Sequence, residues 1–179
     1  MRWIVLLLWP VGAWLAGCSP AFNWREIRLE EAPLTVLLPC KPDRGSRTVP
    51  LAGESVELRM LGCETGGATF AVSQVRLRPG APAAEALTQW RAAMLANMQG
   101  RDVREQPFLP AGSLPLPQSV RLTATGQRVD GRPVQGQAAW FAHPSPQGMW
   151  LFHAVVYADA VPPEAADAFF GGLKLQGLP

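Results

Sequence analysis

The N-terminal segment constrains this chain most, because it decides which residues and which of the three cysteines are left to fold. Arg2 precedes a run of about 14 uncharged residues over 3–16, which ends in the small Gly17. A basic start, a short apolar stretch and a small-residue exit are typical of a secretory signal peptide. A membrane-spanning helix needs about 18 or more apolar residues, and this run also contains Pro10. The sequence therefore predicts a signal peptide over residues 1–17.

The end of this segment, Leu15-Ala16-Gly17-Cys18, resembles the lipobox of bacterial lipoproteins. That resemblance implies that the Cys18 thiol receives a diacylglycerol, that a peptidase cuts before it, and that the new amino group is acylated. Three acyl chains would form a permanent anchor, whereas one chain binds a membrane only marginally. Ser19 is not the aspartate that retains such proteins in the inner membrane of many Gram-negative bacteria. The resemblance thus implies an outer-membrane protein that faces the periplasm.

An ordinary secretory peptide that is cut elsewhere, with Cys18 incidental, is the alternative interpretation. On the lipoprotein interpretation, residues 18–23 form a lipidated tether and residues 24–179 form a single globular domain. The five residues after Cys18 span at most about 15–18 Å when fully extended. We therefore expect the domain to stay close to the bilayer.

The charge balance of the mature chain argues against nucleic acid as a partner. Without Arg2 the chain carries 15 basic and 14 acidic side chains, so it is close to neutral. Binding to a polyanion would need a clear basic excess.

Two cysteines remain once Cys18 is acylated, and both stand at the ends of strand-like runs. Cys40 follows residues 34–39 and Cys63 follows residues 56–62. An even pair in an oxidising compartment predicts a disulfide. It would close a loop of about 24 residues and stabilise the fold by about 3 kcal/mol. A metal or redox pair is the alternative, but the CxxC spacing and a third ligand are missing.

Alternating apolar and polar residues predict a mainly antiparallel β-protein. Residues 149–157 are apolar on both faces, which predicts a central strand that is covered on both sides. Turn residues separate the runs at 41–45, 66–67, 130–131 and 145–148. The predicted strands are residues 24–29, 34–38, 47–51, 54–63, 69–77, 103–108, 119–128, 132–141, 149–157 and 173–175.

Two helices are predicted beside these strands. From residue 82 to residue 98, apolar side chains recur in steps of three and four, including Leu87, Trp90 and Met94. Residues 162–170 form a shorter helix that Gly171 and Gly172 end. We therefore expect an α+β fold in which a single antiparallel sheet is flanked by one long and one short helix.

The order of these elements, with Leu-Pro-Cys-Lys-Pro near the start and Phe-Phe-Gly-Gly-Leu-Lys-Leu near the end, resembles small proteobacterial lipoproteins of uncharacterised function. It resembles the PsbP-like fold more weakly, and this implies an antiparallel sheet flanked by helices. Neither resemblance carries a binding residue or an activity.

The sequence lacks the motifs of the common enzyme classes. It contains no HExxH, GxSxG, P-loop or GxGxxG pattern. As metal ligands, His143 and His153 would need a third partner from a distant segment. Cys40 cannot be both a nucleophile and a disulfide partner. We therefore expect no metal, no cofactor and no enzymatic activity.

Three functions remain as hypotheses. The first is a non-enzymatic, lipid-anchored module that binds an envelope protein or helps to maintain the envelope. The second is a carrier or sensor of a small apolar or lipidic ligand in a pocket walled by Trp90, Met94 and Trp140. The third is a hydrolase whose site is assembled from scattered residues. The Pro-rich residues 109–117 either cap the core or dock on a partner.

Overall fold

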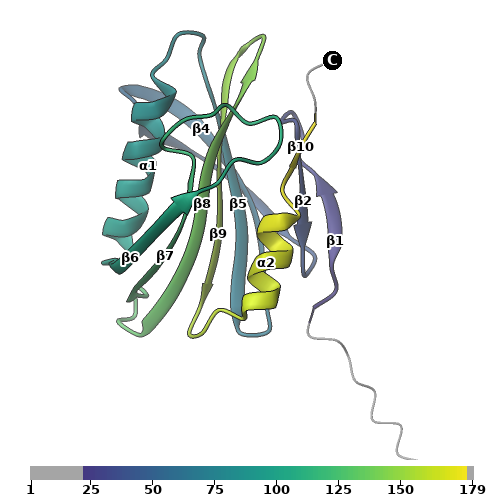
Figure 1. Ribbon diagram of the computed structural model, residues 1–179, viewed down its shortest axis with the longest axis vertical. Helices are drawn as coiled ribbons and strands as arrows, with labels where there is room; N and C mark the ends of the chain where they lie inside the picture. The colour runs from purple at the N-terminus through teal and green to yellow at the C-terminus, as the bar shows by residue number, and fades with distance from the viewer. Residues whose placement is uncertain (1–21, 177–179) are drawn as a thin grey trace, which may run out of the picture.

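The computed structural model describes residues 22–176, so the predicted signal peptide and the lipidation site Cys18 lie outside the described residues. Two antiparallel sheets and two helices form three layers (Figure 1). The large sheet has the strand order β3-β4-β5-β9-β8-β7-β6, and the small sheet has the order β1-β2-β10. The strands are β1 (Arg25–Arg28), β2 (Leu34–Leu38), β3 (Asp43–Leu51), β4 (Glu54–Thr65), β5 (Ala68–Leu77), β6 (Arg101–Pro107), β7 (Val120–Gln127), β8 (Pro133–Ser145), β9 (Gly148–Ala158) and β10 (Lys174–Leu175).

The two helices lie on opposite sides of the large sheet (Figure 1). Helix α1 (Ala83–Asn97) covers one face, and α2 (Pro163–Gly171) lies on the other side together with the small sheet. Strand β9 is the fourth of seven strands, and its alternate residues enter the two cores. Leu151 and Val155 belong to the core under α1, while Phe152 and Val156 belong to the core shared with the small sheet. The predicted central strand is confirmed.

The α+β class is confirmed, but the expectation of a single sheet is wrong. Strand β2 pairs with β1 and β10 and has no ladder to the neighbouring strand β3. Pro39 and Pro42 flank the connection between β2 and β3. Because proline has no N–H to donate to a ladder, the chain leaves the small sheet here and enters the large one. The turn expected over residues 41–45 is shorter, since β3 begins at Asp43.

The predicted disulfide between Cys40 and Cys63 is confirmed, with the two Cα atoms 5.9 Å apart. Cys40 follows β2 of the small sheet and Cys63 lies on β4 of the large sheet. The bond therefore connects the two sheets rather than two strands of one sheet.

The Pro-rich segment before β7 rests on the core under α1. Leu114 and Leu116 pack against that core, and the Leu114 N–H donates to the Ala142 carbonyl at 2.8 Å. These contacts favour the capping interpretation of residues 109–117.

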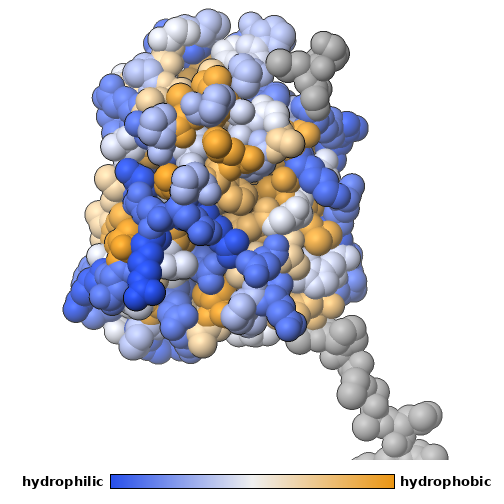
Figure 2. Space-filling view, viewed as in Figure 1, coloured by the Kyte–Doolittle hydropathy of each residue, from blue (hydrophilic) through white to orange (hydrophobic). Residues whose placement is uncertain are grey.

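Strand β6 forms one edge of the large sheet, and all of its residues are exposed. Figure 2 shows hydrophilic side chains over this region and apolar ones gathered above them. The pairing of β6 with β7 is irregular between Arg101 and Arg104, and Asp102 between them has a φ of 53°. Charged side chains and a bulge protect an edge strand against pairing with another chain.

Candidate functional site

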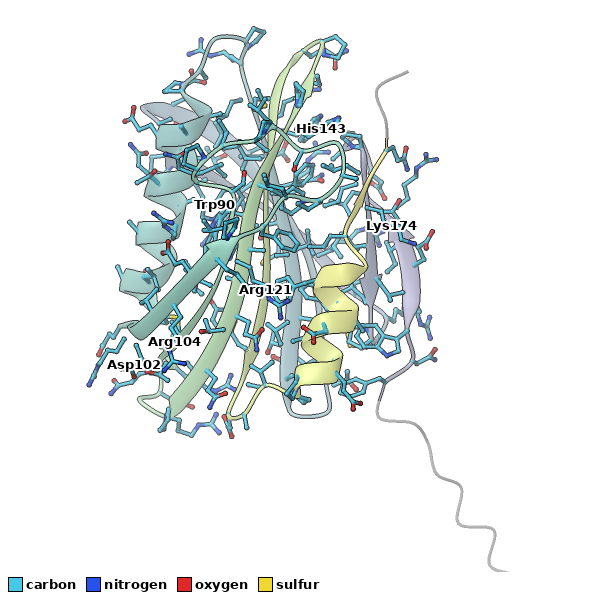
Figure 3. All side chains as sticks on the ribbon, viewed as in Figure 1. Trp90, Asp102, Arg104, Arg121, His143 and Lys174 are labelled. Carbon is cyan, nitrogen blue, oxygen red and sulfur yellow. A yellow bond between two sulfur atoms is a disulfide. The ribbon has the colours of Figure 1, made fainter. Side chains whose placement is uncertain are left out.

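A cavity of about 390 Å³ lies between helix α1 and the large sheet. Helix α1 forms its roof, and strands β3, β4, β5 and β9 form its floor. Figure 3 shows Trp90 between the helix and the sheet. The lining residues are Arg47, Val49, Pro50, Leu51, Leu58, Met60, Thr69, Ala71, Ser73, Gln89, Trp90, Ala93, Met94, Asn97, His153, Val155 and Tyr157.

The fully buried residues of α1 lie toward its two ends. Ala83, Ala86 and Leu87 are buried in the first turns, and Met94 is buried in the last. No residue of α1 between Leu87 and Met94 is buried, and Trp90 is half-buried. Trp90 packs against the edge of this core and lines the cavity together with Met94.

His153 lies on the cavity floor and is uncharged at neutral pH. Only 7% of the residue is exposed, and burial lowers the pKa of its imidazole to about 3. Its ring stacks on Trp140, with centroids 4.7 Å apart, and lies 5.5 Å from the Trp90 ring. Its Nε2 atom is buried and has no hydrogen-bond partner among the described residues.

Trp140 does not line the cavity, so the prediction that it walls a pocket together with Trp90 and Met94 is wrong for this residue. It is fully buried on β8 and pairs in register with His153 on β9. The two rings stack side by side on the same face of the sheet, so Trp140 lies beyond His153, on the side away from the cavity. Trp90 and Met94 do line the cavity.

Ten of the seventeen lining residues are apolar, and one lining residue within the described chain is charged at neutral pH, namely Arg47. Burial raises the pKa of the Tyr157 phenol to about 12, so it is neutral as well. Arg47 lies on the edge strand β3 and is exposed at the rim. It takes part in none of the ion pairs between described residues.

A second hollow of about 510 Å³ adjoins the cavity, and both are lined by Thr69, Asn97 and Tyr157. It opens beside the β7–β8 hairpin, where Val129 is fully exposed. The cavity under α1 thus continues toward the end of the molecule that carries this hairpin.

The charged residues of another hollow, beside Met60, compensate one another. Arg59 pairs with Glu57 at 3.0 Å and with Glu31, whose carboxyl pKa it lowers through a hydrogen bond and its charge. Arg44 pairs with Glu30 at 3.8 Å. Exposed pairs of this kind contribute little to stability. The lowered pKa of the Glu31 carboxyl is unlike the raised pKa of a general acid.

Neither a metal cluster nor a membrane-spanning helix is found within residues 22–176. No group of three or more His, Cys, Asp and Glu side chains there could hold a metal ion. No helix in that part of the chain is both long and apolar enough to cross a membrane.

Two features of the site were not assigned from the sequence. The sequence predicts that His153 lies in the central strand, but not that it faces a pocket, because its face of the sheet depends on which side α1 packs. Arg47 had no assigned face, since residues 43–48 of β3 are all exposed and show no apolar alternation. The one signal for Arg47 was its position just before the apolar residues Val49 and Leu51.

Comparisons with known proteins add no relative. The chain matches no protein-family model, and no curated protein matches its sequence.

Proposed function

We propose that this protein is a non-enzymatic lipoprotein, anchored through Cys18 to the periplasmic face of the outer membrane, that carries or senses a small apolar or lipidic ligand. The cavity under α1 is the observation that supports ligand binding over the partner-binding module considered first. The lipobox and the short tether support the location.

The form of the cavity suits a ligand better than a packing defect. The cavity opens to solvent at β3 and α1, where Arg47, Pro50 and Ala93 are exposed, so it is not an enclosed packing void. Small-molecule sites occupy about 300–1,000 Å³ and are lined mainly by apolar and aromatic side chains with a few polar groups. The cavity under α1, at about 390 Å³ with Trp90 and Met94 in its roof, matches this description at the small end.

Ligand binding is tested by filling the cavity from its roof. Ala93 and Ala92 are neighbouring exposed residues of α1, and Ala93 lines the cavity while Ala92 does not. We expect Ala93→Phe to weaken binding of the neutral apolar dye N-phenylnaphthylamine about tenfold, because the added ring occupies ligand space. Ala92→Phe is the matched control and should bind like the wild type. Equal binding by both variants would contradict the proposal.

The location is tested separately through the lipid anchor. The wild-type chain should incorporate labelled palmitate and sediment with outer membranes, and Cys18→Ala should do neither. Mass spectrometry of native protein that shows an unmodified amino terminus away from residue 18 would overturn the anchor.

A further inference from the structure

The charge of the cavity indicates which ligand it takes. On the basis of the ligand site proposed above, we infer that the ligand is an amphipathic monoanion with a single alkyl chain and one terminal carboxylate. The carboxylate binds the guanidinium of Arg47, and the alkyl chain lies under α1.

In the cavity, an anionic group would find one cationic partner and no acidic side chain that repels it. Arg47 is the single charged residue among those described that line it, and no lining residue is acidic. A guanidinium presents paired N–H donors that match the two oxygens of a carboxylate. A cationic headgroup would meet a like charge, and a neutral one would gain no ionic contact.

Glu57 on β4 and Glu85 on α1, two elements that border the cavity, are engaged elsewhere. Glu57 pairs across the ladder with Thr48, the residue after Arg47, so it projects to the opposite face, where it binds Arg59. Glu85 of α1 accepts a hydrogen bond from the Gln89 side chain at 2.9 Å. The Arg47 guanidinium is therefore open to an external anion.

The position of Arg47 fixes the orientation of the ligand. A charged group is costly to bury, so it belongs at the exposed rim on β3. From β3 the floor runs across β4 and β5 to β9, three strand spacings of about 4.8 Å, or roughly 14 Å in all. Leu58, Met60 and Met94 provide apolar walls along this path. A single alkyl chain of about this length fits it.

The inference is tested with three probes that share one chain and differ in headgroup, namely dodecanoate, dodecanol and dodecyltrimethylammonium. The full-length protein in phosphatidylcholine nanodiscs is titrated by calorimetry below the micellar concentrations, and the heats of empty nanodiscs are subtracted. We expect dodecanoate to bind most tightly. Arg47→Gln should weaken dodecanoate about fivefold and leave dodecanol unchanged.

The matched control is Arg104→Gln on the opposite edge strand β6, where Figure 3 shows Arg104 apart from Trp90. This variant should bind all three probes like the wild type. Equal affinities for the three probes, or an unchanged dodecanoate affinity in Arg47→Gln, would overturn the headgroup assignment while leaving an apolar ligand site. Binding of none of the probes would overturn the ligand site as well.

Discussion

Lowering the pH should destabilise the fold through His153. In the folded protein this imidazole is buried on β9, and burial lowers its pKa from 6.5 to about 3. In the unfolded chain the pKa returns to its ordinary value, so between pH 6.5 and pH 3 the unfolded state binds the extra proton. The stability associated with neutral His153 is therefore complete above pH 6.5 and is lost as the pH falls toward 3.

The size of this effect follows from the two pKa values. Each pH unit in the window costs up to about 1.4 kcal/mol of unfolding free energy. Between pH 7.5 and pH 4.5 the loss due to His153 should reach about 2.7 kcal/mol.

The assay compares the wild type with His153→Phe by urea unfolding, followed by tryptophan fluorescence at the two pH values. Phenylalanine keeps a ring against Trp140 and removes the titrating group together with the unpartnered Nε2. The titration of carboxyl groups is common to both proteins and cancels in the comparison. The wild type should lose about 2.7 kcal/mol more than the variant. Parallel losses, equal within about 0.5 kcal/mol, would show that His153 is not held neutral by burial.

Two further predictions concern the frame that holds the cavity. Replacing Cys40 and Cys63 together by serine should lower the free energy of unfolding by about 3 kcal/mol, because the bond closes a long loop between the two sheets; an unchanged urea midpoint would refute this. Gly148→Ala should lower the free energy of unfolding by about 3 kcal/mol, since φ is 128° and an added Cβ would lie 1.9 Å from the Leu77 carbonyl oxygen. Gly131→Ala, with φ 80° and open space around it, should cost only about 1 kcal/mol in the same assay, and equal costs would exclude the clash as the cause.

The sequence predicted best those features of the fold that depend on the residue pattern of a single segment. The alternation in β4 and the two-sided apolar run in β9 predict these strands and the central place of β9, because burial on a pleated sheet repeats every second residue. The division into two sheets was not predictable in this way. Which strands pair depends on the path of the chain after Pro39. The alternation of apolar and polar residues within one strand carries no information about that path.

The site was predictable in part for the same reason. Helical spacing places Trp90 and Met94 on one face of α1, and both line the cavity. Trp140 lies on the correct face of β8, but the cavity ends at β9, where the adjacent His153 stands between Trp140 and the ligand space, and this depends on the register between β8 and β9. Arg47 stands on an exposed edge strand, where no apolar pattern indicates which way a side chain faces.

Methyl NMR during a titration with dodecanoate tests the ligand cavity most directly. We predict shifts confined to methyl groups that line the cavity, above all those of Leu51, Leu58 and Met94. The methyl groups of Val72 and Val156, in the core on the other side of the large sheet, should not move. Shifts in that second core, or none at Leu58 and Met94 at saturating dodecanoate, would contradict a ligand site under α1.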